Sequence, residues 1–300
     1  MSASRKAAVR AAFDRAASGY DAAALLQREI AARLDERLDL MKLTPTRVLD
    51  AGCGTGHALP GLRRRYPAAH LLGLDLAPAM LGVAARQTEP GRWRRLGRTL
   101  TGRGGSASSF LCGDLERLPL ARASLDLVWS NVTLQWMSDL EQTFREVRRV
   151  LRPDGLFVFS TFGPDTLGEL RAAFAGIDGF AHVNRFVDMH DVGDLLIHAG
   201  FQHPVMEMER ITLTYADLRG LLRDLKAIGA QTVLDAPRRG LLGRTAWQRL
   251  ETAYEAFRRD GRLPATYEVI YGHAWAGAQE RLADGRQVIQ MKIARKRGGL

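Results

Sequence analysis

Apolar residues recur along the chain at two spacings. Within residues 5–40 they return at helical spacing, which predicts one or two helices. From residue 47 onward, short apolar runs alternate with amphipathic segments. The runs predict strands at 47–50, 70–76, 110–112, 125–130 and 156–161, and the segments predict helices at 58–66, 79–87 and 140–151. Strand–helix–strand alternation of this kind predicts an α/β fold with a parallel sheet and right-handed crossovers.

The alternation is less regular elsewhere. Residues 88–108 are polar, basic and rich in glycine, which predicts a loop insertion. Beyond residue 162 we expect mostly helix over 164–200. Further strands are predicted at 205–214, 267–275 and 288–293, and further helices at 216–228 and 245–259. We therefore expect an N-terminal helical lid at 1–45, a core at 46–162, and substrate-side helices and closing strands of the same domain at 163–300.

Three glycines follow the first predicted strand at spacings of two residues. They are Gly52, Gly54 and Gly56, and they precede a helix. Glycine permits positive φ and lets a ligand approach the backbone closely, while the first turn of the helix offers free amides. A dinucleotide site would place its third glycine at position 57, which is His57. The spacing therefore argues against NAD.

Acidic residues stand at the ends of the next two strands. Asp75 follows Gly56 by nineteen residues, where a carboxylate can accept both hydroxyls of a ribose. Asp114 ends the third strand and could meet an adenine amino group, or could act only as a helix cap. The fourth strand ends at Asn131, at the edge where open α/β sheets bind ligands.

This ordered set, spanning roughly 48–161, resembles the class I S-adenosylmethionine (SAM) dependent methyltransferases. The resemblance implies their Rossmann-like sheet with helices on both faces, SAM as cofactor, and no metal. By the same resemblance, Asp50 and Gly52 lie near the methionine amino group, Asp75 holds the ribose, and Asp114 with Leu115 flanks the adenine. The full predicted cofactor set is Asp50, Ala51, Gly52, Gly54, Gly56, Asp75, Leu76, Met80, Asp114, Leu115 and Asn131.

Longer segments resemble one group of these enzymes, the malonyl-acyl carrier protein O-methyltransferases of biotin synthesis. The segments are residues 11–21, 129–136, 162–171, 182–186, 224–229 and 263–272. The resemblance implies methyl transfer to the free carboxylate of a malonyl thioester on an acidic acyl carrier protein. A carboxylate is already ionised at pH 7 and needs no general base, but it needs orientation. Arginine can orient it bidentately, so Arg185 or Arg171 is expected to anchor it, although either could be a surface arginine.

Tyr20 belongs to the N-terminal segment that folds over the cofactor in this family. It is expected to reach the site, and the alternative is ordinary helix packing. Two other functions stay open. One is a related SAM-binding arginine hydroxylase of respiratory-complex assembly, which shares the segments at 165–171 and 265–267, although residues 182–186 favour the carrier-protein enzyme. The other is a non-catalytic, basic nucleic-acid binder, against which the intact glycine turn and both aspartates argue.

Composition bounds partners and location. The formal net charge is +10, and almost all of the basic residues are arginine. This excess fits either an acidic partner such as a carrier protein or a bias of genome composition. Apolar runs are too short to cross a bilayer, and no apolar signal segment follows the first basic residues. Two widely separated cysteines fit a reduced compartment. We expect a cytoplasmic protein without a membrane partner.

Overall fold

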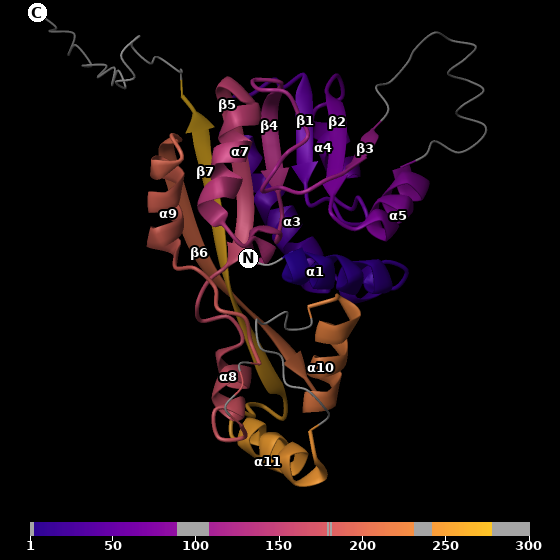
Figure 1. Ribbon diagram of the computed structural model, residues 1–300. Helices are drawn as coiled ribbons and strands as arrows, with labels where there is room; N and C mark the ends of the chain where they lie inside the picture. Colours follow the sequence, from indigo (N-terminus) through magenta and orange to yellow (C-terminus); the bar gives the residue numbers. More distant parts are fainter. Residues whose placement is uncertain (1–2, 89–107, 179, 181, 231–241, 278–300) are drawn as a thin grey trace, which may run out of the picture.

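A seven-stranded sheet forms the body of the protein in the computed structural model, which describes residues 3–88, 108–178, 180, 182–230 and 242–277 (Figure 1). The strands lie in the order β3-β2-β1-β4-β5-β7-β6. Their bounds are β1 Arg47–Ala51, β2 His70–Asp75, β3 Ser109–Cys112, β4 Leu125–Ser130, β5 Leu151–Phe162, β6 Gln202–Tyr215 and β7 Leu263–Ala276. The strand order reverses between β1 and β4, because β2 and β3 lie on one side of β1 and β4 lies on the other. The carboxyl ends of the parallel strands β1 and β4 therefore open onto one crevice.

The sheet is mixed, whereas the alternation predicted a parallel one. Strands β1 to β5 pair in parallel, as predicted. Strand β7 runs antiparallel to β5, and β6 runs antiparallel to β7. The prediction of parallel pairing fails there because no short helical crossover separates β5 from its neighbour. The whole segment between residues 162 and 263 intervenes.

Helices cover both faces of the sheet, as the nearly continuous burial of β1, β4 and β5 requires. Leu26, Ile30 and Leu34 of α3 (Leu25–Arg37) pack on one face with α4 (Leu59–Arg65). On the other face, α7 (Leu140–Val150) and α9 (Met189–His198) pack against Phe157 and Phe159 of β5. Neighbouring β5 residues therefore belong to different cores. Helix α5 (Pro78–Thr88) lies beside the outer strands β2 and β3.

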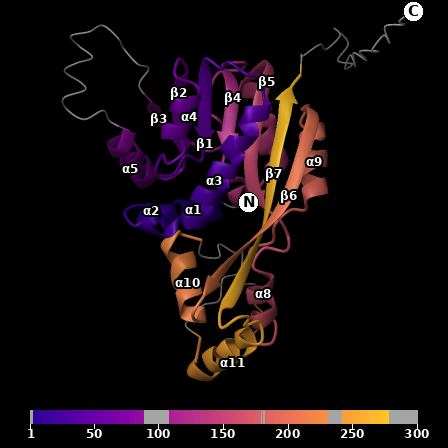
Figure 2. The same cartoon turned by 180° about the vertical axis from the view of Figure 1, so that it is seen from behind.

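The last two strands extend beyond the body of the sheet and carry a second group of helices (Figures 1 and 2). These helices are α8 (Gly168–Phe174), α10 (Leu218–Ala227) and α11 (Arg244–Glu255). The prediction that 164–200 is mostly helical is wrong. Among the residues of that range that the structure describes, α8 and α9 are the helices that form, and an irregular stretch separates them. That stretch contributes to the wall of the cavity described below.

The N-terminal helices α1 (Ala3–Ala16) and α2 (Tyr20–Ala23) lie between the sheet and α10 (Figure 2). Gly229, just after α10, sits close to the backbone of Ala12 and the ring of Phe13. No helix among the described residues is long and apolar enough to cross a membrane. The predicted strand at 288–293 and all of the predicted loop at 88–108 except its two end residues lie outside the described ranges.

Candidate functional site

The glycine turn after β1 is held open by its backbone geometry. Gly52, Gly54 and Gly56 have φ angles of +79°, +53° and +82°, a region that side-chain-bearing residues rarely adopt. A Cβ at Gly52 would lie 2.3 Å from the side chain of Thr133. The amide of Gly52 donates to the carbonyl of Leu74 at 2.7 Å, which ties the turn to β2. The first two glycines line a cavity, and Gly56 instead faces Ala84 of α5.

Two carboxylates flank this turn. Asp75, at the end of β2, accepts the amide of Gly54 at 2.9 Å and the amide of Ala77 at 2.8 Å. These bonds fix the carboxylate and leave lone pairs on both oxygens for a ligand. Asp50 is fully buried in β1, and its Oδ2 has no hydrogen-bond partner. Burial, and secondarily the charge of Asp75, raises the pKa of Asp50 to about 7. A buried, unpartnered carboxylate of this kind suits a cationic amino group.

Asp114 lies on the opposite wall, and its partner comes from the N-terminal helix. Lys6 Nζ lies 2.5 Å from Asp114 Oδ2 and 2.5 Å from Glu116 Oε2. The second oxygen of Asp114 accepts the amide of Glu116 at 3.0 Å. The pKa of Lys6 is raised: burial alone would lower it, but the two carboxylates prevail. The carboxylate predicted to meet adenine therefore also fastens α1 over the site.

Three further contacts hold the N-terminal segment in place. Asp14 Oδ1 accepts the amide of Ala79 at 2.9 Å, and Asp21 accepts hydrogen bonds from Thr55 and Gln87, each at 2.6 Å. Tyr20 lines the cavity. Burial, followed by Asp75 and Asp21, raises the pKa of the Tyr20 phenol well above its usual value, so the hydroxyl stays protonated at pH 7. Tyr20 can therefore donate a hydrogen bond but cannot act as a base.

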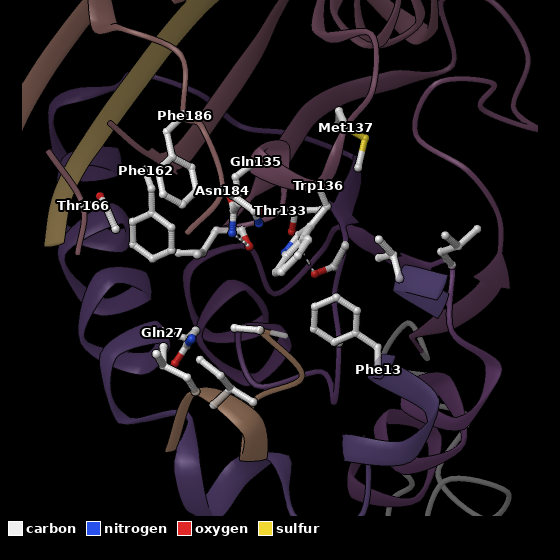
Figure 3. A pocket seen from close by; sticks show the side chains of 18 of the residues that line it. Phe13, Gln27, Thr133, Gln135, Trp136, Met137, Phe162, Thr166, Asn184 and Phe186 are labelled. Carbon is white, nitrogen blue, oxygen red and sulfur yellow. Dashed lines mark hydrogen bonds between the residues drawn. The ribbon is translucent and has the colours of Figure 1, made fainter. Parts of the chain in front are cut away.

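The cavity has a volume of about 370 Å³ and two chemically different parts (Figure 3). The first part is formed by the glycine turn and the strand ends already described. The second part lies toward α8 and α10 and is mostly apolar. Its lining includes Phe162, Leu167, Leu170, Phe174, Phe186, Leu222, Leu225 and Tyr267. A mostly apolar chamber thus adjoins the cofactor wall within one cavity, which permits transfer between two bound molecules.

Neither predicted anchoring arginine lines this cavity. His182, Val183, Asn184 and Phe186 contribute to the wall, and Arg185, between the last two, is exposed. Arg171 is exposed too, and its guanidinium donates to the carbonyls of Pro164 at 2.8 Å and Thr166 at 3.1 Å. The structure therefore gives Arg171 a role in holding a turn.

Most predicted cofactor residues do come together at the cavity. Asp50 lines a smaller adjoining cavity of about 60 Å³, and Ala51 is buried in β1, where its carbonyl accepts a hydrogen bond from Ser130 at 2.9 Å. The residues of the predicted set that line the main cavity are Gly52, Gly54, Asp75, Leu76, Met80, Asp114, Leu115 and Asn131. The Asn131 amide is fixed, since it donates to the carbonyl of Gln27 at 3.0 Å and accepts from Ser160 at 2.8 Å.

Several site residues were missed by the sequence reasoning. Lys6 comes from α1, and Gln27 and Arg28 come from α3; the last two line the cavity part nearest Asp50. Gln135 and Asn184 lie within the segments 129–136 and 182–186, which resemble the carrier-protein enzymes. No local pattern distinguishes them. Each is an ordinary polar residue until the fold places it at the wall.

Comparison with known proteins agrees with this geometry. The model of a methyltransferase domain matches residues 49–159. A malonyl-[acyl-carrier protein] O-methyltransferase of Laribacter hongkongensis is 55% identical over 289 residues, covering 95% of each chain. One of Legionella pneumophila is 40% identical and covers 91% of this chain and 92% of its own. The chain belongs to the malonyl-[acyl-carrier protein] O-methyltransferase family.

Solved structures extend the agreement to the fold of this family member. The YcgJ protein of Bacillus subtilis has a TM-score of 0.55 at 16% identity, over 82% of this chain and 98% of its own. A methyltransferase-like protein of Bacillus halodurans has a TM-score of 0.56 at 17% identity, over 83% of this chain and 99% of its own. At such low identity these likenesses concern the fold alone, and they confirm the predicted Rossmann-like methyltransferase sheet.

The residues of the site fit SAM, the predicted cofactor of the family. The unpartnered Oδ2 of Asp50 suits its amino group, and Asp75 keeps lone pairs for ribose hydroxyls. A side chain at Gly52 would fill the space beside the glycine turn, because a Cβ there already collides with Thr133. Arg28 lines the same small cavity as Asp50 and offers a cation for the carboxylate of the methionine part. The described residues hold no cluster of three or more metal-binding side chains.

Proposed function

We propose that the chain transfers a methyl group from SAM to the free carboxylate of a malonyl thioester carried by an acyl carrier protein. The product is the methyl ester that primes biotin synthesis, and the reaction takes place in the cytoplasm. The observation that carries the proposal is the single cavity in which the cofactor wall adjoins an apolar chamber. The names of the relatives at 40–55% identity support the same substrate. No described feature favours arginine hydroxylation or nucleic-acid binding.

SAM, when bound, supplies a methyl group already activated on a sulfonium. The chain's own task is alignment and exclusion of water. The malonyl carboxylate is ionised at pH 7 and is itself the nucleophile, so no protein base is needed. Phe13 lines the cavity and meets the ring of Trp136 edge to face, with centroids 5.3 Å apart (Figure 3).

We further propose that neutral amides, rather than an arginine, orient the carboxylate. Gln135 Oε1 and Asn184 Oδ1 are buried at the cavity wall without hydrogen-bond partners, and Figure 3 shows the two side chains in one part of that wall. The Asn184 amide can rotate to present its NH₂ group to a carboxylate, because the oxygen and nitrogen of an amide exchange places on rotation. Gln135 Nε2 already donates to the carbonyl of Val132 at 2.8 Å, and its second N–H is left for the substrate. The proposed methyl transfer and the proposed orientation by amides both place the substrate beside Asn131.

Charge explains why neutral donors suit this reaction. A carboxylate loses its negative charge as its oxygen forms the ester bond. A fixed cation would stabilise the charged starting state more than the transition state, and so would raise the barrier. The lysine and histidine side chains of the described lining are committed or distant. Lys6 is bound by two carboxylates, His182 by Asp178 at 2.7 Å, and Lys226 lies at the solvent boundary.

The decisive experiment is a direct assay. Purified chain is mixed with SAM and malonyl-acyl carrier protein, and the acyl group is analysed by mass spectrometry. The expected product carries one added methyl on the distal carboxylate, with an equal amount of S-adenosylhomocysteine released. Succinyl-acyl carrier protein and acetyl-acyl carrier protein serve as matched controls, and the second has no free carboxylate. A protein that binds SAM but leaves malonyl-acyl carrier protein unmodified would refute the proposal.

A further inference from the structure

The apolar part of the cavity meets solvent beside Lys226. Among the lining residues that the structure describes, Lys226 is the one with an exposed side chain, and the rest are buried or half-buried. Lys226 lies in the last turn of α10. The cavity wall continues from there through Leu225 and Leu222 of the same helix toward the apolar interior. A substrate that enters at this mouth therefore passes along α10.

The outer face of α10 carries a stripe of three cations, which we call the α10 basic stripe. It consists of Arg219, Arg223 and Lys226, at spacings of four and three residues, so the side chains are neighbours on one helix face. All three residues are exposed. The opposite face is anchored by the buried Leu218 and Leu221. The stripe ends at the mouth of the cavity.

Nearby carboxylates do not cancel this charge. Asp217 caps the helix by accepting the amide of Gly220 at 2.7 Å. Asp224 faces Tyr215, whose pKa is raised to about 12 by burial and then by that carboxylate. Glu251 pairs with Arg219 at 3.4 Å. Within the described ranges, Arg223 and Lys226 have no ion pair, so the part of the stripe nearest the mouth keeps two positive charges.

We infer that the α10 basic stripe is the docking surface for the acidic carrier protein, whose pantetheine arm enters beside Lys226. The inference rests on the proposed function and adds the place of contact to it. An arm that is thin and extended suits a mouth that opens along one helix, and the protein at the base of the arm then lies over α10. Charge complementarity with an acidic protein would speed encounter and fix its orientation.

The test is charge reversal at Arg223, which does not line the cavity. Arg223→Glu should lower kcat/KM for malonyl-acyl carrier protein about tenfold or more, chiefly through KM, and the defect should shrink at high salt. Activity on malonyl-pantetheine, which lacks the carrier, should stay within about twofold of wild type because the cavity is unchanged. Arg223→Lys should retain carrier activity, since the charge is kept.

The matched control is Arg64→Glu, which makes the same charge change at an exposed position of α4, at the other end of the molecule (Figure 1). It should leave both substrates unaffected. If Arg223→Glu and Arg64→Glu behave alike on malonyl-acyl carrier protein, the docking surface lies elsewhere. Wild type that methylates neither substrate would instead refute the proposed function.

Binding measured without turnover separates the two failures further. Immobilised holo-acyl carrier protein should bind wild type and the Arg64→Glu variant equally and bind Arg223→Glu at least about fivefold more weakly. Equal binding by all three would overturn the inference whatever the activity. Single-stranded RNA of matched charge is the competitor, and RNA that binds tighter than the carrier protein and depends on Arg223 would assign the stripe to nucleic acid instead.

Discussion

Lys6 and Asp114 join the first helix of the chain to the end of the third strand across 108 positions of sequence, with 2.5 Å between Nζ and Oδ2. Glu116 shares the same ammonium. We expect Lys6→Met to loosen α1 over the cofactor and to speed SAM dissociation. Each pair is partly exposed, so the loss should be about 0.5–1 kcal/mol, or roughly two- to fivefold in dissociation rate. The SAM dissociation rate is measured by stopped-flow chase, and Lys42→Met, at an exposed position, is the control. Equal dissociation rates in the two variants would contradict a role for Lys6 in holding α1 over the cofactor.

Asp75 should be the costliest single carboxylate for cofactor binding. Its two oxygens are fixed by the amides of Gly54 and Ala77, so the group is already oriented for a ribose. Asp75→Ala should weaken SAM binding by on the order of 2–4 kcal/mol, because two hydrogen bonds to a charged group are lost. Titration calorimetry gives the affinity, and circular dichroism checks that the fold is intact. A folded variant with wild-type affinity would remove Asp75 from the site.

SAM affinity should depend on pH through Asp50. Its pKa of about 7, raised mainly by burial, means that the carboxylate is largely protonated in the free protein below pH 7. The cationic amino group requires the ionised form, so binding must first remove that proton. Affinity should therefore rise from pH 6 to pH 8, by at most about tenfold per unit below the pKa. Calorimetry over this range measures the trend.

Two controls assign that dependence to Asp50. Asp50→Asn should bind SAM more weakly and without the trend over the same window. 5′-Methylthioadenosine, which lacks the amino-acid part, should bind wild type with little pH dependence. A trend that survives in Asp50→Asn would assign the titration to another group. In the free protein the sign for stability is opposite: a raised folded-state pKa makes Asp50 destabilising as pH rises from about 4 toward 7.

Substitutions at the neighbouring residues Asn184 and Arg185 test which side chain orients the malonyl carboxylate. Asn184→Leu should lower kcat about ten- to hundredfold with unchanged SAM affinity, since it removes a positioned donor at the cavity wall. Arg185→Ala should change kcat less than about threefold, because a surface side chain outside the wall contributes little. The ranking is measured at saturating SAM. A larger loss in Arg185→Ala would restore the arginine as the anchor.

The central part of the fold was predictable because local signals there agree with tertiary structure. Strand β1, the glycine turn and α4 each carry their own pattern, and β1 to β5 pair as the alternation implied. Pairing of β6 with β7 was not predictable from periodicity. It joins residues separated by up to about 70 positions, and nothing in either strand specifies its partner.

The cofactor wall was predictable for the same reason, since the glycines and Asp75 lie in fixed register with the strands. The substrate side was not. Whether Arg185 or Asn184 faces inward depends on the local backbone of an irregular segment, where no periodicity indicates which side chains face the cavity. Lys6 and Arg28 act only after the N-terminal helices have docked, a tertiary event with no local signature.

The position of α1 has a kinetic consequence. Lys6, Val9 and Phe13 close the cofactor part, whereas the other end of the same cavity opens beside Lys226. We therefore expect donor and acceptor to enter from different sides of the cavity, with α1 lying over the donor. Turnover should then be ordered, with SAM first to enter and S-adenosylhomocysteine last to leave. A methylated carrier can depart and be replaced without disturbing the helix that guards the spent cofactor.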